Sequence, residues 1–381
     1  MKRKIIRVTT VDISLDALLK GQLKYLSKKY EVIGLAADTG VLDAVSKREG
    51  IRVINVPMHR EISLPADINC LFKLIRVFRD EKPLIVHANT PKGSLLSMVA
   101  AKLVGVPNRL YTVTGLRYQG ASGVGRRFLK LMERITCLCA TNVIPEGDGV
   151  KTTLLTDGIT NKPLSVIHNG NINGIDTSYF AKEACQISRE KVQIMLNLSS
   201  NDYVFVFVGR IVRDKGINEL AEAMQSLSKV YPQAKLILVG PFEDTLDPIL
   251  SVNEKFLRNS TNVRIVGEQP DIRPYLLVSD AFVFPSYREG FPNVVLEAGA
   301  MGLPAIVTDI NGSNEIIKEG INGVIIPPRD RASLYDKMAW FIEHPSCVKT
   351  MSDNARTMIT SRYEQQDVWN ALMMMYNELE Q

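Results

Sequence analysis

Residues 281–297 read AFVFPSYREGFPNVVLE, and this pattern predicts a buried strand, a tight loop and a helix in succession. Pro292 is expected near the first helical position, where a missing N–H costs nothing. The free N–H groups of such a helix end attract anions, phosphate above all. Glu289 lies on the loop in front of this site, and Glu297 lies about one turn inside the helix. Without their context, Glu289 and Glu297 would be interpreted as a surface residue and a helix-start residue. Their position in a predicted strand, loop and Pro-initiated helix instead favours two carboxylates that face a phosphorylated ligand.

A second segment indicates the same chemistry. Residues 203–208 form the apolar run YVFVFV, which GRIVRDKG follows at 209–216. A cationic loop directly after a parallel strand lies at the carboxyl edge of the sheet, where open α/β sheets bind ligands. Arg210 can donate two hydrogen bonds to phosphate oxygens, and Lys215 can add a mobile positive charge. An isolated Arg–Lys pair would suggest a solvated turn, but together with the helix end it predicts a diphosphate clamp that needs no metal.

The whole chain alternates short apolar runs with helical patterns, which is typical of βαβ units and a parallel sheet. Its 381 residues, 45% apolar and 23% charged, suit a globular protein of two domains. The expected strands are 5–9, 32–36, 53–56, 84–87, 110–113, 142–144, 165–167, 204–208, 236–239, 263–266, 281–284, 305–307 and 323–326. The expected helices include 15–27, 68–79, 94–103, 218–230, 293–301 and 332–341.

Composition also bears on the compartment. Five scattered cysteines suggest a reducing cytoplasm, and there is no apolar stretch of the roughly 18 residues that a membrane span requires. Residues 1–180 carry 26 Lys and Arg against 15 Asp and Glu, so this half has a net charge of +11, whereas the remainder has −6. A basic half suggests an anionic partner. Nucleic acid is disfavoured because no recognition motif is present.

One basic segment also carries apolar residues. An expected helix carries four basic residues, Arg126, Arg127, Lys130 and Arg134, and the apolar residues Phe128, Leu129, Leu131 and Met132 lie between them. This helix could lie on the anionic face of a membrane. A solvated helix face that packs on the sheet is an equally good interpretation of the same pattern.

At these motifs the chain resembles the retaining glycosyltransferases of family 4, which have the GT-B fold. The segments that carry the resemblance are 209–216, 289–297 and 304–315, together with 21–26, 87–93 and 169–176, which are similar to the bacterial polysaccharide members. The resemblance covers essentially the whole chain. It implies an α/β protein of two Rossmann-like, doubly wound parallel-sheet domains that face one another across a cleft. Residues 1–175, with a terminal helix at about 364–381, would bind the acceptor, and residues 176–363 would bind the donor.

The resemblance also implies the donor-site residues. Arg210 and Lys215 would hold the donor diphosphate, Glu297 would bind the ribose, and Glu289 would meet the donor sugar. Glu289, Arg210 and Lys215 are therefore the candidate catalytic residues. The segments expected to add backbone and base contacts are Gly290, Phe291 and Asn293 beside the helix end, and Val266 with the residues up to 271. No metal and no other cofactor is expected.

The acceptor side departs from the family pattern. Many members carry a His after the fifth strand of the first domain, and Thr114 stands at the matching position here. Thr cannot titrate near neutral pH, so a His-based role fails. Arg117 or Tyr118 could substitute in sugar or acceptor binding, and a leaving diphosphate that accepts the acceptor's proton would need no His. His87 could contact the acceptor or could be a satisfied strand-end His.

These features favour a retaining glycosyltransferase that moves a hexose or N-acetylhexosamine from a nucleotide-diphosphate sugar to a polyprenyl-diphosphate-linked glycan in surface polysaccharide biosynthesis. Such an enzyme would be cytoplasmic and peripheral at the inner face of the cell membrane. A nucleotide-sugar epimerase of the same architecture is one alternative, since fold similarity alone does not separate the two activities. A catalytically weak binding subunit is another, although the full set of Arg210, Lys215, Glu289 and Glu297 argues against it.

Overall fold

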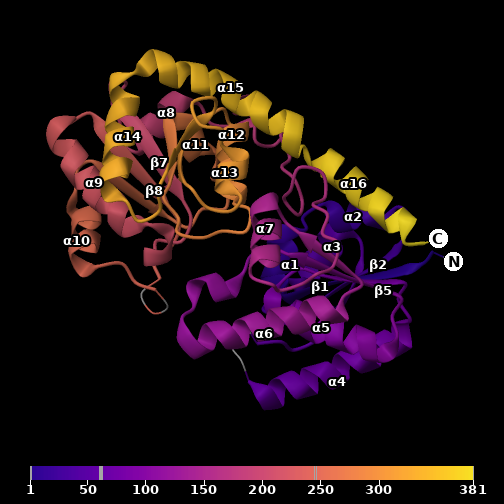
Figure 1. The fold of residues 1–381 in the computed structure, drawn as a ribbon. Helices are drawn as coiled ribbons and strands as arrows, with labels where there is room; N and C mark the ends of the chain where they lie inside the picture. Colours follow the sequence, from indigo (N-terminus) through magenta and orange to yellow (C-terminus); the bar gives the residue numbers. More distant parts are fainter. Residues whose placement is uncertain (1, 60–62, 244, 246, 381) are drawn as a thin grey trace. The chain divides into compact units, whose positions relative to one another are not determined.

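The computed structural model describes residues 2–59, 63–243, 245 and 247–380, and these form two compact units (Figure 1). Unit 1 comprises residues 1–174 and 365–381, and unit 2 comprises residues 175–364. Each unit is built on one six-stranded parallel sheet flanked by helices. The α/β class and the two Rossmann-like, doubly wound sheets expected from the sequence are therefore present. Each predicted boundary differs from the observed one by a single residue.

The sheet of unit 1 has the strand order β3-β2-β1-β4-β5-β6. Its strands are β1 (Lys4–Val11), β2 (Glu31–Ala37), β3 (Arg52–Asn55), β4 (Ile85–Ala88), β5 (Asn108–Val113) and β6 (Asn142–Pro145). Its helices are α1 (Asp12–Leu18), α2 (Gln22–Ser27), α3 (Leu42–Glu49), α4 (Leu64–Glu81), α5 (Pro91–Val104), α6 (Gly123–Cys139), α7 (Asp148–Thr156) and α16 (Gln365–Glu378), with a 3-10 turn at Arg117–Gly120.

The sheet of unit 2 has the order β12-β11-β10-β7-β8-β9, which is the same winding read from the opposite edge. Its strands are β7 (Tyr203–Val208), β8 (Ala234–Val239), β9 (Val263–Gly267), β10 (Ala281–Phe284), β11 (Ala305–Thr308) and β12 (Gly323–Ile326). Its helices are α8 (Arg189–Met195), α9 (Ile217–Val230), α10 (Ser251–Asn259), α11 (Arg273–Val278), α12 (Asn293–Ala300), α13 (Ser313–Ile316), α14 (Arg331–Glu343) and α15 (Pro345–Tyr363), with 3-10 turns at Lys182–Ala184 and Arg213–Lys215.

The strand order reverses once in each sheet, between β1 and β4 in unit 1 and between β7 and β10 in unit 2. At this switch point the connections that follow the two central strands leave toward opposite faces of the sheet. A crevice therefore opens beyond the carboxyl ends of these strands, and ligands of such sheets bind there. In unit 2 the loops that follow these central strands are 209–216 and 285–292. They are the two segments that the sequence singled out.

Helices cover both faces of the unit 1 sheet because its strands are apolar on both sides. Along β1, Ile6 and Val8 join the cluster that also contains Leu74 of α4 and Met98 of α5. Ile5 faces the other way, into a cluster with residues of α1, α2, α3 and α16. This alternation follows from the two-residue period of a strand. It also places Arg7 on the face of β1 that carries Ile5.

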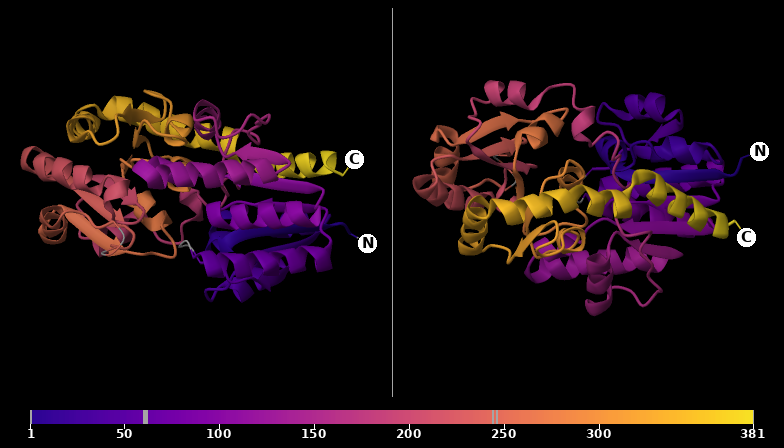
Figure 2. Two further views of the ribbon diagram at one scale, coloured as in Figure 1. Left: turned by 60° about the horizontal axis from the view of Figure 1, so that its bottom comes forward. Right: turned by 90° about the horizontal axis from the view of Figure 1, so that it is seen from above.

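Helix α16 belongs to unit 1 and packs against residues that are distant from it in the sequence. Trp369 Nε1 donates to Asn173 Oδ1 at 2.7 Å, and the Tyr25 hydroxyl donates to Asn370 Oδ1 at 2.6 Å. Near the two ends of the chain, Arg3 Nη1 donates to the carbonyl oxygen of Glu380 at 3.0 Å, so the terminal segments lie side by side (Figure 2).

Two expected elements differ in the structure. The single helix predicted over 15–27 is two helices, because Gly21 between them adopts φ +80 and the chain turns there. The strand predicted at 165–167 is absent, and only Leu164 makes one isolated bridge, to Val143. The bridge at Leu164 is not continued, and His168 just beyond the predicted strand has φ +53, which is not an extended conformation.

Candidate functional site

The 209–216 and 285–292 loops touch one another at the switch point of unit 2. Gly216 has φ +71, and a Cβ atom on it would lie 2.1 Å from the carbonyl oxygen of Pro285, so only glycine permits this approach. The Tyr287 N–H donates to the Asp214 carbonyl oxygen at 2.9 Å and closes the contact. The two loops are thereby held together, although 74 residues separate Lys215 from Glu289 in the sequence.

Lys215 and Glu289 form an ion pair at this junction, and both side chains are 18% exposed. The Ser286 hydroxyl donates to Glu289 Oε1 at 2.8 Å, and Lys215 Nζ lies 5.5 Å from the ring centroid of Phe284. A partly desolvated pair interacts more strongly than one in water. An anion that approaches Lys215 therefore has to share this ammonium group with Glu289.

Arg210 stands on the same loop but has a different partner. Its guanidinium pairs with Glu243, and its side chain is 54% exposed while that of Glu243 is 22% exposed. Both cations of the predicted diphosphate clamp thus lie on one loop at the switch point. Each is paired with a carboxylate.

Glu297 lies on α12, and its carboxylate has no hydrogen-bond or ion-pair partner among the residues that the structure describes. Burial raises the pKa of this carboxyl to about 7. The cost of holding a carboxylate away from water without a partner is the physical cause. A group of this kind can accept hydrogen bonds from ligand hydroxyls, which is the role predicted for it.

The start of α12 lies next to this carboxylate. Pro292 is the N-cap residue, and the helix begins at Asn293 rather than at Pro292. Phe291 is buried, with its ring centroid 5.6 Å from that of Tyr363, so its side chain belongs to the core. A Cβ on Gly312 would lie 2.7 Å from the Gly290 carbonyl oxygen, so the loop after β11 supports this turn. The backbone, not the side chain of Phe291, is what the segment offers to a ligand.

The segment predicted to contact a base follows β9. Val266 is half-buried, and its carbonyl oxygen accepts a hydrogen bond from Gln269 Nε2 at 2.6 Å. Asp271 pairs with Arg273 at 2.7 Å and closes the turn. The loop is therefore ordered by its own side chains.

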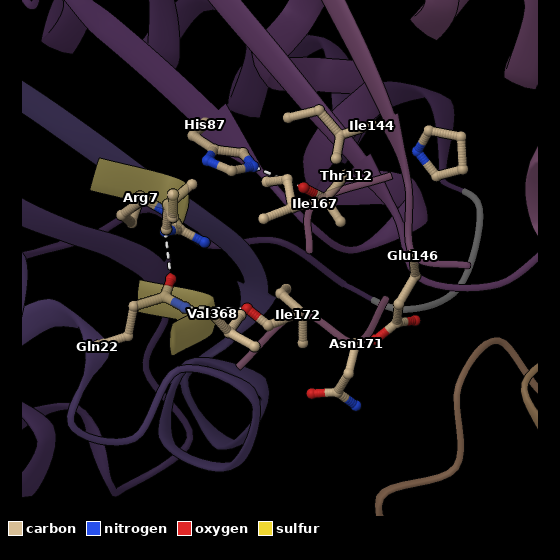
Figure 3. Close-up of a pocket in the computed structure, with 12 residues that line it drawn as sticks. Arg7, Gln22, His87, Thr112, Ile144, Glu146, Ile167, Asn171, Ile172 and Val368 are labelled. Carbon is tan, nitrogen blue, oxygen red and sulfur yellow. Dashed lines mark hydrogen bonds between the residues drawn. The ribbon is translucent and has the colours of Figure 1, made fainter. Parts of the chain in front are cut away.

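A buried polar network lies on the α2 and α16 side of the unit 1 sheet (Figure 3). The fully buried Arg7 donates from Nη1 to Gln22 Oε1 at 2.5 Å and from Nη2 to Asn89 Oδ1 at 2.9 Å. His87 Nδ1 is 2.6 Å from the Tyr376 hydroxyl, and His87 Nε2 is 2.6 Å from Thr112 Oγ1. The network joins three strands to α2 and α16.

His87 is therefore the satisfied strand-end His of the two alternatives. It is 1% exposed, and both ring nitrogens are hydrogen-bonded. Burial and the neighbouring Arg7 charge hold the pKa of His87 well below its usual range, so the ring is neutral. A direct contact with an acceptor would require this network to break.

The other predicted acceptor residues follow β5. Thr114 is half-buried and donates to the Asn89 carbonyl oxygen at 2.8 Å. Tyr118 is buried, 1% exposed, with Lys130 Nζ 5.2 Å from its ring centroid, so it is a packing residue rather than an open contact. Arg117 is exposed in the 3-10 turn, and it is the member of this group whose charge reaches solvent.

Two family models match the chain: "Glycosyl transferase 4-like domain" over residues 26–170 and "Glycosyl transferases group 1" over residues 188–358. The capsular polysaccharide biosynthesis glycosyltransferase CapM of Staphylococcus aureus is 32% identical over 376 residues, which span 98% of this chain and 97% of CapM. The chain belongs to the family 4 type of glycosyltransferases. An Escherichia coli UDP-Gal:alpha-D-GlcNAc-diphosphoundecaprenol alpha-1,3-galactosyltransferase is 28% identical over 379 residues, 95% of each chain.

Solved structures agree on the fold of this glycosyltransferase. Anabaena HepE in complex with UDP-glucose superposes with a TM-score of 0.81 at 19% identity, over 98% of this chain and 99% of HepE. A sucrose-phosphate synthase from Thermosynechococcus elongatus gives 0.78 at 19% identity, over 99% of both chains. At this level of identity the likeness shows the GT-B fold.

Sequence reasoning missed three residues of this glycosyltransferase that the structure connects to the predicted site. The sequence places Ser286 on a loop without indicating that its hydroxyl donates to Glu289. No local pattern marks Glu243, because its contact with Arg210 spans 33 residues. Arg7 could have been noticed, since a charge between apolar residues of a buried strand needs partners elsewhere in the fold.

Proposed function

We propose that this chain is a configuration-retaining glycosyltransferase that transfers a hexose or N-acetylhexosamine from a nucleotide-diphosphate sugar to a lipid-linked saccharide in surface polysaccharide biosynthesis. The observation that carries the proposal is the group at the switch point of unit 2. There Lys215 and Glu289 meet, and Arg210 extends from the same loop as Lys215. Glu297, which has no partner within the described part of the chain, lies on the following helix. These groups match the parts of a nucleoside-diphosphate sugar in number and in charge.

Each group has a role in donor binding. Arg210 and Lys215 hold the diphosphate, Glu297 accepts hydrogen bonds from ribose hydroxyls, and Glu289 faces the sugar. The backbone from Gly290 to Asn293 adds N–H groups at the start of α12. HepE carries UDP-glucose in its solved complex, which supports a uridine or related nucleotide as the first donor to test.

In the transfer step, the bond between the anomeric carbon and the diphosphate oxygen breaks as the acceptor hydroxyl bonds to that carbon on the same face. The acceptor proton passes to an oxygen of the leaving diphosphate, so no His is required and Thr114 is compatible with the reaction. Arg210 and Lys215 stabilise the negative charge that develops on the leaving group. This mechanism needs no metal, and activity is expected to survive EDTA.

The acceptor is assigned to unit 1, whose basic residues suit an anionic lipid-diphosphate glycan. Arg117 is the exposed cation of the loop after β5, and we assign it to the acceptor. CapM is named as a glycosyltransferase of capsular polysaccharide biosynthesis, and the Escherichia coli galactosyltransferase is named for a diphosphoundecaprenol-linked acceptor. Both favour a polyprenyl-diphosphate-linked saccharide for this chain.

A membrane-facing surface is proposed on α6, at the inner face of the cell membrane. Exposed apolar residues Val124, Phe128, Leu131 and Leu138 run along this helix, and Arg126, Arg127 and Arg134 are exposed beside them. Lys130 was expected to contribute, but its Nζ donates to Asp157 Oδ1 at 2.7 Å and its side chain is only 22% exposed. None of the described helices has the length and apolar character needed to cross a bilayer.

The test is incubation of the purified protein with UDP-, GDP- and ADP-linked hexoses and N-acetylhexosamines, with and without polyprenyl-diphosphate-linked saccharides, followed by mass spectrometry. Acceptor-dependent gain of one sugar, with the anomeric configuration of the donor kept in the product, is the expected result, with or without EDTA. Epimerised nucleotide sugar without transfer would contradict the proposal, as would an inverted linkage. Loss of all activity in EDTA, restored by a divalent cation, would refute the metal-independent part.

A further inference from the structure

The loop after β8, of which the structure describes residues 240–243, 245 and 247–250, is fastened to the cationic 209–216 loop. The Ile211 N–H donates to the Pro241 carbonyl oxygen at 2.8 Å, and the Arg213 N–H donates to the Asp247 carbonyl oxygen at 3.1 Å. A Cβ on Gly240 would lie 1.9 Å from the carbonyl oxygen of Gly209, so the two loops are in contact at their first residues. The carboxylates on the second loop are therefore held beside the cations of the first.

Among the described residues of this loop, Glu243 and Asp247 contact the cationic loop in different ways. Asp247 Oδ1 accepts from Arg213 Nε at 3.0 Å and lies 2.9 Å from Arg213 Nη2, while Asp247 Oδ2 accepts from the Asp214 N–H at 2.7 Å. Glu243 contacts Arg210 through a single pair of atoms, Nη1 and Oε2. Asp247 thus anchors the loop through several contacts. The single contact between Glu243 and Arg210 is the one that an anionic ligand of Arg210 can replace.

We propose that Glu243 is an internal competitor for the donor diphosphate: its carboxylate occupies Arg210 when the site is empty and returns to it when the nucleoside diphosphate leaves. This inference rests on the proposed function, because it takes Arg210 as a diphosphate ligand. Carboxylate and phosphate oxygens compete for the same guanidinium N–H groups. A phosphate that reaches Arg210 also brings a second anion next to Glu243, and the two repel.

The consequence is a site that binds the nucleoside diphosphate less tightly than its cations alone would allow. Product release limits the turnover of many enzymes, and a carboxylate that re-forms its ion pair favours release. Glu289 shares Lys215 in a similar way, but it also bonds to Ser286 and is assigned to the sugar. Glu243 has no such second role and can be changed without touching the sugar site.

The experiment compares Glu243→Gln with the unsubstituted protein, using Arg210→Ala and Glu254→Gln as controls; Glu254 pairs with Arg258 rather than with Arg210. Calorimetry with UDP, and competition with inorganic diphosphate as a base-independent probe, measure affinity, and stopped-flow dilution measures UDP release. Glu243→Gln is expected to bind UDP about 1.5- to five-fold more tightly at low salt, the scale of one partly exposed ion pair, and to release it more slowly. The difference should shrink at about 0.5 M salt, because screening weakens both the pair and the repulsion.

Three results decide between the possibilities. If Glu243→Gln binds UDP as the unsubstituted protein does, or more weakly, while Arg210→Ala loses affinity, the competitor role is overturned and the donor site stands. If Glu254→Gln tightens binding as much as Glu243→Gln, the effect is a general charge effect and the assignment to Glu243 is wrong. If UDP and diphosphate do not bind, or Arg210→Ala leaves binding unchanged, the donor assignment itself fails and the inference falls with it.

Discussion

Replacing Glu297 with glutamine should make the protein more stable at neutral and alkaline pH while weakening its hold on a nucleotide. Burial raises the pKa of this carboxyl from an ordinary 4.5 to about 7. Because the folded-state pKa is raised, folding costs nothing extra below pH 4.5, where the carboxyl is protonated in both states. The penalty grows as pH rises from about 4.5 to 7 and is complete above that range.

The size of the effect follows from these two pKa values. A rise from 4.5 to about 7 corresponds to roughly 3 kcal/mol at pH 8 and about 1 kcal/mol at pH 5, since one unit is worth about 1.4 kcal/mol. Glutamine keeps the shape and removes the ionisation. For a domain of this size about 1 kcal/mol shifts the Tm by roughly 2–4 °C, so Glu297→Gln should gain about 6–12 °C at pH 8 and a few degrees at pH 5. These are upper limits, because part of the side chain meets solvent.

The assay is thermal unfolding of both proteins at pH 5 and pH 8, followed by calorimetry with UDP at pH 8. The exposed Glu183 offers a matched control, and Glu183→Gln should leave Tm within about one degree at both pH values. Affinity for UDP should fall in Glu297→Gln even without a sugar, because the ribose hydroxyls lose an ionised acceptor. Equal destabilisation by Glu297→Gln at both pH values would refute the burial argument, and unchanged UDP affinity would refute the ribose role.

Three further changes test other parts of the site. Lys215→Ala should lower kcat on the order of 100-fold, about 2–4 kcal/mol, because the leaving diphosphate loses a cation in a partly desolvated site; near-normal kinetics in a folded variant would remove Lys215 from the mechanism. Glu289→Gln should reduce turnover and leave UDP affinity near that of the unsubstituted protein, since an interaction made mainly in the transition state appears in kcat; abolished UDP binding would reverse its role with that of Glu297. Charge reversal at Arg126 and Arg127 should weaken co-sedimentation with anionic vesicles and its salt dependence, whereas Lys130→Glu, tested for stability as well, should act mainly on folding through Asp157. Vesicle binding that ignores Arg126 and Arg127 would remove α6 from the membrane contact.

The alternation of apolar runs and helical patterns was enough to predict βαβ units and parallel sheets, whereas the doubly wound, two-domain arrangement was implied by the family resemblance. A strand such as Tyr203–Val208, apolar at every position, can only be buried on both faces, and that requires helices on each side. The carboxyl-edge position of the 209–216 and 285–292 loops followed from the same logic, because parallel strands end at a common edge. Local signals failed at two elements. Gly21 divides the helix predicted over 15–27, and the strand predicted at 165–167 is replaced by an isolated bridge at Leu164 that ends before His168, whose φ is +53.

Only the tertiary structure decided which charges meet. Arg210 and Glu243, Lys215 and Glu289, and Lys130 and Asp157 are pairs separated by 33, 74 and 27 residues, and no local pattern specifies them. The same holds for His87, whose strand-end position allowed either a ligand contact or a buried bond. The return of α16 settled the matter, because it brings Tyr376 to the ring across 289 residues of sequence. Periodicity determines which face of an element is buried, whereas the partner of a polar group depends on where distant elements come to lie.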